Sequence, residues 1–183
     1  MASRLCQVVP AAANHRGFFA RKRLLEYYRD MTQVAILKKK SYLAMVHNAA
    51  RGENHLFQNL WASVDGEARD INKNGALACG FFTSAILFLN KLIGDLHAGV
   101  AGLERDLAAS GWTQISELRE GAVIIWEPRP GADGTPHLHA GFYVGDDRAV
   151  SNGSNSTLMP EEHHATYDGT RKIERIWWHP DLE

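Results

Sequence analysis

Cys79 lies near the start of an almost unbroken apolar run, GALACGFFTSAILFL (75–89), in a chain of 183 residues with two cysteines. The run predicts a buried helix that begins beside the cysteine. A thiol in the first turn of a helix faces unpaired backbone N–H groups and the positive end of the helix dipole, and both favour the thiolate. We therefore expect a lowered pKa for Cys79 and a thiolate that attacks acyl carbon.

A later segment, HLHAGFYVG (137–145), reads as a strand that carries a candidate general base, His139. Strand alternation places His137, His139, Gly141 and Tyr143 on one face and Leu138, Ala140, Phe142 and Val144 on the other. If the apolar set packs elsewhere, the histidine face is free to meet the Cys79 helix. A protonated imidazole of His139 beside Cys79 would lower the pKa of the thiol further.

The next predicted strand, RAVSN (148–152), would supply the residue that orients the imidazole of His139. Strict register from His139 reaches Ser151. Asn152 is the more strongly polar candidate, but it is one place further on and requires a bulge to reach the same face. Both residues remain candidates at this point.

Three segments in this order, LACGFFTSAILFL, LREGAVIIWE and HAGFYVGDDRAVSN, resemble the core of the NlpC-type cell-wall peptidases and the related CHAP families of the papain-like superfamily. The resemblance covers about residues 75–152. It implies Cys79 as nucleophile, His139 as base, the backbone N–H of Cys79 as an oxyanion donor, and Asn152 or Ser151 as the third residue. It also implies cleavage of amide bonds in peptidoglycan stem peptides, or a related acyl transfer, with no cofactor.

Two other interpretations stay open. Cys79 could be a small buried hydrophobe in a non-catalytic binding module on the same fold. Alternatively, the histidines of HLH share a strand face and could bind zinc together with one or more of Cys79, His163, His164 and His179. His163 and His164 are adjacent, so at most one of them can reach a given site, and we expect both mainly at the surface.

The order of elements, helices first and strands afterwards, predicts an α+β fold with N-terminal helices packed on an antiparallel sheet. The resemblance implies that this fold is of the papain-like kind. Helical spacing occurs within 21–47, at Leu56, Leu60 and Val64, and at Val100, Leu103 and Leu107 before a stop at Gly111. Strands are predicted at 122–127, 137–145, 148–152 and 171–180.

Charge divides the chain near Gly52, because residues 1–52 carry a net charge of +8 and the remainder carries −9. This predicts a boundary near residue 52, with a basic, mainly helical extension over 1–52. The resemblance implies an NlpC/CHAP-like papain-fold domain over 53–183. The lysines at 38–40 form a solvated helix face or dock an acidic partner. No aromatic or glycine-rich recognition pattern accompanies them, which argues against nucleic acid.

The first residues lack the apolar core of a secretory signal. Asn90, Lys91 and Asp95 interrupt the apolar run at Cys79 too early for a membrane span. We therefore expect a cytoplasmic protein with a peptide or peptidoglycan fragment as substrate, or one that leaves by a leaderless route.

Overall fold

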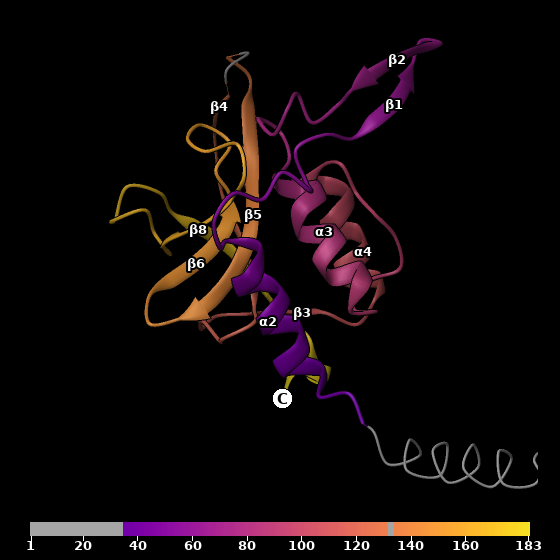
Figure 1. Cartoon of the computed structure of the whole chain (residues 1–183). Coiled ribbons are helices and arrows are strands. Elements are labelled where there is room, and N and C mark those ends of the chain that lie inside the picture. The colour runs from indigo at the N-terminus through magenta and orange to yellow at the C-terminus, as the bar shows by residue number, and fades with distance from the viewer. Residues whose placement is uncertain (1–34, 132–133) are drawn as a thin grey trace, which may run out of the picture. The chain divides into compact units, whose positions relative to one another are not determined.

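An antiparallel sheet of six strands lies at the centre of the described chain (Figure 1). The computed structural model describes residues 35–131 and 134–183, and a compact unit runs from Leu37 to Glu183. In spatial order the strands are β3 (Thr113–Ile115), β8 (Ile173–Trp178), β4 (Val123–Pro130), β5 (Pro136–Gly145), β6 (Arg148–Asn152) and β7 (Pro160–His164). The four predicted strands are confirmed as β4, β5, β6 and β8, whereas β3 and β7 were not predicted.

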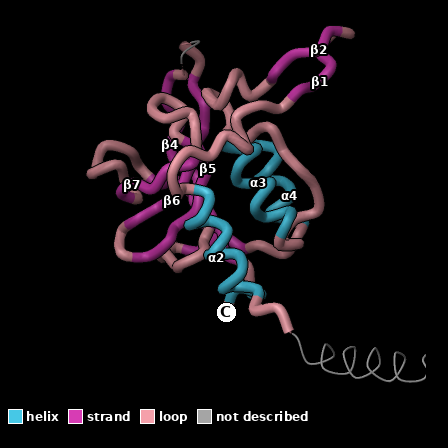
Figure 2. The backbone as a smooth tube through the Cα atoms, in the orientation of Figure 1, coloured by secondary structure: helices cyan, strands magenta, loops and turns pink. Residues whose placement is uncertain are grey.

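Three α-helices occur within the described residues: α2 (Lys38–Ala49), α3 (Cys79–Leu89) and α4 (Val100–Ala109), as Figure 2 shows. A short 3-10 helix, η1 (Pro180–Leu182), follows β8. Helices α2 and α3 pack on the face of β5 that carries Phe142, whose ring meets Tyr42 and Phe82 edge-on at centroid distances of 5.6 Å. Helices α3 and α4 confirm two of the sequence predictions. The part of the predicted helix before residue 35 lies outside the described residues.

Residues 56–64 do not form the predicted short helix. They lead instead into a two-stranded hairpin of β1 (Trp61–Val64) and β2 (Glu67–Asp70), which projects away from the large sheet (Figure 1). The turn between them holds Asp65 and Gly66 at φ values of 55° and 84°. Two left-handed residues in succession match the twist of a hairpin and cannot continue a helix. The prediction was wrong because the spacing of Leu60 and Val64 also fits strand alternation.

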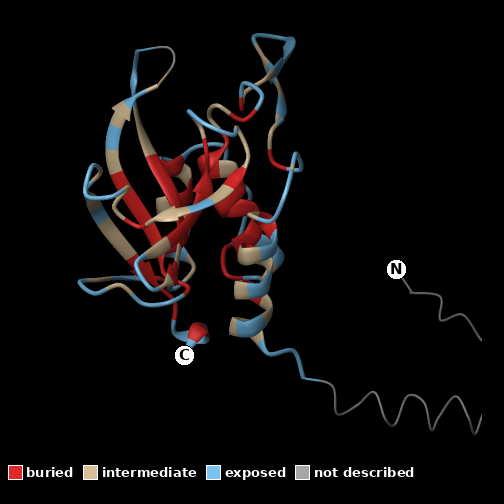
Figure 3. Cartoon of the chain, turned by 60° about the vertical axis from the view of Figure 1, so that its left-hand side comes forward, coloured by how far each residue is buried: buried red, intermediate tan, exposed pale blue. Residues whose placement is uncertain are grey.

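Both faces of the central strands are covered by apolar side chains. The face towards the helices holds Val123, Ile125, Ala140, Phe142 and Val150. A second, smaller cluster on the other face contains Ile124, Trp126, Ala149 and Ala165, with Tyr143 and Tyr167 packed against it. Buried residues, red in Figure 3, therefore run through the sheet as well as the helices. His139, the polar residue in the buried middle of β5, is thus removed from water.

The fold is α+β with antiparallel sheets, as predicted, although the hairpin separates α2 from the other two helices. Helix α2 belongs to the compact unit despite lying in the segment assigned to the basic extension. Tyr42 and Val46 have no exposed surface, and the Tyr42 hydroxyl donates to the carbonyl of Gly121 at 2.9 Å. No helix of the described residues is long and apolar enough to cross a membrane.

The lysines at 38–40 are partly engaged within the chain. Lys38 forms an ion pair with Asp181, and the ammonium group of Lys39 lies 5.4 Å from the centroid of the Trp178 ring. Because these contacts tie α2 to the segment around η1, two of the three lysines have an internal role.

We expect Tyr42→Ala to lower the free energy of unfolding by about 3–5 kcal/mol, the usual cost of truncating a buried aromatic side chain. The measurement is urea denaturation. Asn48→Ala on the exposed side of the same helix is the matched control and should change stability by less than about 0.5 kcal/mol. Equal stability of both variants would show that α2 does not belong to the folded core.

Candidate functional site

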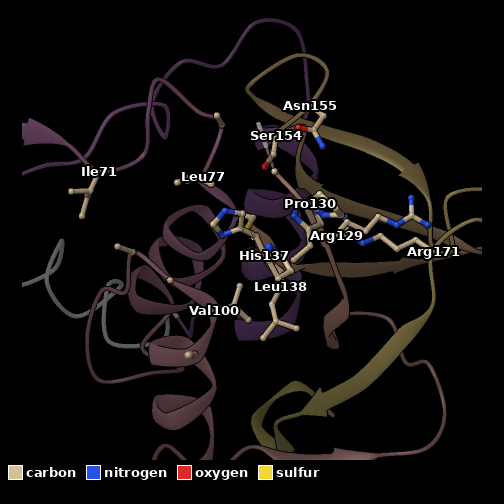
Figure 4. Close-up of a pocket in the computed structure, with 18 residues that line it drawn as sticks. Ile71, Leu77, Val100, Arg129, Pro130, His137, Leu138, Ser154, Asn155 and Arg171 are labelled. Atoms are coloured by element: carbon tan, nitrogen blue, oxygen red, sulfur yellow. Dashed lines mark hydrogen bonds between the residues drawn. The ribbon is translucent and has the colours of Figure 1, made fainter. Parts of the chain in front are cut away.

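A cavity of about 440 Å³ lies beside the first turn of α3, and both Cys79 and His139 line it. Figure 4 shows its two sides: Ile71, Leu77 and Val100 on the helical side, and Ser154, Asn155, Arg129 and Arg171 on the strand side. The fold thus brings the predicted nucleophile and base to one cavity, although they are far apart in the sequence.

Cys79 is the first residue of α3 and is 8% exposed. Its Sγ–H donates to the carbonyl of Leu138 at 3.8 Å, so the thiol lies against the edge of β5 beside His139. The preceding residue, Ala78, provides no side-chain cap, which leaves the first-turn N–H groups without a side-chain acceptor.

Burial raises the pKa of Cys79, a direction opposite to the one predicted from its place at the helix start. The backbone N–H groups of Ala140 and Gly80 and the charge of Arg171 lower this pKa, but they do not outweigh desolvation. At rest the group is a thiol and not a thiolate.

The orientation of β5 also differs from the expectation. Ala140 and Phe142 face α3, whereas His139 and Gly141 face the second cluster around Trp126. The predicted histidine face therefore does not meet the helix, because the apolar helix packs on the apolar face of the strand. The thiol contacts β5 through backbone atoms on both sides of His139 in the sequence: the carbonyl of Leu138 and the N–H of Ala140.

Ser151 is the predicted orienting residue that contacts His139. Strands β5 and β6 pair Gly141 with Ser151, so Ser151 and His139 are diagonal neighbours on one face. His139 Nε2 and Ser151 Oγ are 2.8 Å apart. A Cβ at Gly141 would lie 2.7 Å from the Cβ of Ser151, which means that only glycine permits this approach.

Ser151 is in turn bound by His163, which sequence analysis placed mainly at the surface. His163 Nε2 lies 2.8 Å from Ser151 Oγ, and His163 Nδ1 lies 2.9 Å from the carbonyl of His164. The Tyr167 ring stacks on His163 at 4.1 Å and its hydroxyl is 3.1 Å from Ser151 Oγ. We call His139, Ser151 and His163 the polar relay.

The hydrogen bonds of the polar relay fix the proton positions. A carbonyl only accepts, so Nδ1–H of His163 donates to His164 and the neutral ring must accept at Nε2. The single hydroxyl proton of Ser151 therefore donates to His163, and Nε2–H of His139 donates to Ser151. His139 Nδ1 then carries the lone pair, as a general base requires.

Both imidazoles of the relay are neutral at pH 7. Burial, followed by the positive charge of Arg171, lowers the pKa of His139 from 6.5 to about 3. Burial is also the main cause of the lowered pKa of His163. The donor and acceptor assignments above hold for neutral rings and are therefore consistent with these directions.

Asn152, the other predicted orienting residue, points away from His139. Its Nδ2–H donates to the carbonyl of Gly75 at 2.7 Å, and its Oδ1 is buried without a hydrogen-bond partner among the described residues. Gly75 has a φ of 94°, and a Cβ there would lie 2.2 Å from the carbonyl oxygen of Leu158. Asn152 thus holds the loop that leads into α3 and acts on Cys79 only through the backbone.

From the sequence, His163 was named only as a surface residue or zinc ligand, and three further residues of the site were missed: Tyr167, Arg129 and Arg171. The pairing of Ala149 with His163 places that histidine on the face of Ser151, but this register is not visible before β7 is recognised. A metal site from HLH lacks a ligand set, since no three His, Cys, Asp or Glu side chains converge within the described chain. His137 Nε2 instead lies 2.7 Å from Thr135 Oγ1.

No family model matches the chain, and no match was found among curated proteins or solved structures.

We expect Gly141→Ala to destabilise the protein by about 1–3 kcal/mol and to separate Ser151 from His139, because the added methyl overpacks the strand pair. Thermal or urea unfolding measures the cost. Gly99→Ala is the control, since a Cβ there meets no atom within 4 Å. If both variants unfold alike, β5 and β6 are not packed as closely as described.

The lowered pKa of His139 predicts an acid-dependent stability. The unfolded chain protonates this histidine as pH falls through 6.5, whereas the folded chain keeps it neutral to about pH 3. The free energy of unfolding should therefore fall by about 2 kcal/mol between pH 7 and pH 5 from this group. Urea denaturation of the wild type and of His139→Gln at both pH values checks this, and an identical pH dependence in the variant would contradict it.

Proposed function

We propose that this protein is a cysteine-dependent amide hydrolase on a papain-like fold, with Cys79 as nucleophile and His139 as general base. One observation carries the proposal: a thiol at a helix start and an imidazole with its Nδ1 lone pair left free line the same cavity. The polar relay supports it, because the relay sets the tautomer and ring orientation of His139 from behind.

The first step would be a proton transfer at the moment of attack. Substrate binding displaces the Sγ–H of Cys79 from the Leu138 carbonyl, and the thiol proton moves to Nδ1 of His139. The sulfur then bonds to the amide carbon, and the carbonyl oxygen becomes an oxyanion held by the backbone N–H of Cys79. Since the resting pair is neutral, the charges form only with substrate present.

Collapse of the tetrahedral intermediate breaks the carbon–nitrogen bond. The imidazolium of His139 gives its Nδ1 proton to the leaving amine, which departs and leaves an acyl group on Cys79. Water, deprotonated by the same nitrogen, attacks the thioester and releases the carboxylic acid and the thiol. Throughout, Nε2–H of His139 stays bonded to Ser151, so no proton needs to move along the relay.

The substrate class follows from the resemblance to the NlpC-type and CHAP families, which implies peptide amide bonds of peptidoglycan. An amine acceptor in place of water would give acyl transfer from the same intermediate. The residues of the site support either outcome, because the two reactions share the acyl-enzyme.

The second candidate is a binding module without catalysis. The buried thiol, its raised pKa and its hydrogen bond to a strand carbonyl favour this alternative, since all three describe a structural cysteine. The two candidates differ in whether Cys79 accepts an acyl group.

The test is acylation by p-nitrophenyl acetate, followed by mass spectrometry of the modified peptide. We expect one acetyl group on Cys79, released by hydrolysis, and a rate at least about 10³-fold lower in His139→Gln. Cys6→Ser is the control for the other thiol and should retain acetylation at Cys79. Wild-type protein that is folded but never acetylated at Cys79 would support the binding module.

Muropeptides released from purified sacculi then test the substrate class. The hydrolase should convert defined stem peptides to shorter products, and Cys79→Ser should abolish the conversion. Acetylation without muropeptide cleavage would retain the hydrolase chemistry and reject peptidoglycan as the substrate.

A further inference from the structure

Two arginines, Arg129 and Arg171, line the cavity that contains Cys79 and His139 (Figure 4). We propose that they form an anion-binding subsite that accepts a carboxylate of the substrate, so that the preferred substrate is an acidic peptide. This inference deepens the proposed function, on which it rests.

A β-bulge places Arg129 in the site. Strand β4 pairs Trp126 with His139 but Arg129 with His137, so β4 has three steps where β5 has two. The extra residue restores Arg129 to the strand face that carries both histidines, whereas unbroken alternation from Trp126 would turn it to the other face. Bulges of this kind re-aim single side chains at binding sites.

Arg171 enters from the turn before β8 and is held firmly. Its Nε–H and Nη2–H both donate to the carbonyl of Glu127, at 3.2 and 2.9 Å. The guanidinium carbon lies 5.8 Å from the centroid of the Tyr167 ring. Three contacts, made by the Glu127 carbonyl and the Tyr167 ring, thus fix the orientation of Arg171, and a fixed guanidinium loses little conformational entropy when it binds an anion.

Glu127 positions both arginines without cancelling their combined charge. Its backbone carbonyl accepts the hydrogen bonds of Arg171, and its Oε1 lies 3.5 Å from Nη2 of Arg129. That same Oε1 also accepts the backbone N–H of Lys172. One carboxylate shared in this way leaves a positive excess for two guanidinium groups.

The described lining of the cavity contains no acidic side chain. Glu161 lines an adjoining cavity of about 330 Å³ together with both arginines, but its two oxygens accept hydrogen bonds from Ser156 and Thr157. The cavity of Cys79 therefore has a cationic side and, opposite it, an apolar side with Ile71, Leu77 and Val100 (Figure 4). A carboxylate would bind on the cationic side, where two guanidinium groups can hydrogen-bond it.

The test compares two alkylating reagents that differ only in charge, iodoacetate and iodoacetamide. Their rate ratio at Cys79, resolved from Cys6 by mass spectrometry, cancels the intrinsic reactivity of the thiol. With an anion subsite, the iodoacetate to iodoacetamide ratio should exceed that of glutathione by about fivefold and fall with added salt.

Arg129→Gln and Arg171→Gln should each return the ratio towards that of glutathione. Lys172→Gln is the matched control, because Lys172 is exposed and does not line the cavity, so the substitution removes the same charge outside the subsite. This variant should keep the wild-type ratio. A glutathione-like ratio in the wild type, or equal losses in all three variants, would overturn the proposal. Acetylation by the neutral p-nitrophenyl acetate tests the hydrolase separately, so the two hypotheses can fail independently.

A second measurement does not depend on a reactive thiol. Glutarate titrated into wild-type protein should shift the Nε–H NMR signals of Arg129 and Arg171, and the neutral analogue glutaramide should not. If neither signal moves, or both compounds move them equally, the arginines do not bind carboxylate.

Discussion

The pairing of Gly141 with Ser151 is the contact on which the rest of the site depends. It brings the Ser151 hydroxyl to His139, and because side chains alternate along β6, it also turns Asn152 to the opposite face. There Asn152 binds Gly75 and fixes the loop before Cys79. A shift of the β5–β6 register by one residue would turn Ser151 and Asn152 to the opposite faces. The hydrogen bonds to His139 and to Gly75 would then both be lost.

Much of this fold could be predicted because strands and helices leave a periodic trace in the sequence. The α+β class, helix α3 and the central strands were visible in this way. The hairpin at 61–70 was not visible, because the spacing of Leu60 and Val64 also fits a helix. The left-handed conformations of Asp65 and Gly66, which form the turn, exclude that helix. Alternation along β5 grouped His139 with Gly141 correctly, but it could not say which face the apolar helix α3 would cover.

Three residues of the candidate site, Cys79, His139 and Ser151, were named from the sequence, but the direction of the pKa shift of Cys79 was not. Position at a helix start favours a thiolate by about 0.3–1 kcal/mol, whereas full burial can shift a pKa by several units in the other direction. In this chain the second layer around Trp126 buries His139, and the close contact with β5 buries Cys79. The contact of His163 with Ser151 was not predicted for a related reason. A histidine pair in a polar segment indicates surface residues, and the sequence does not show that Tyr167 stacks on His163 and covers it.

Arg171 connects the binding side of the cavity with the proton-transfer side. Its charge lowers the pKa of His139 and also that of Cys79, so it disfavours the imidazolium while it favours the thiolate. A carboxylate bound to this guanidinium would weaken both effects, because the interior screens charge poorly. The base would become stronger at the same moment that the substrate is positioned. The charge of the substrate would then help to set the pKa values of both Cys79 and His139. The neutral thiol and imidazole would be the expected state of the site before an anion binds.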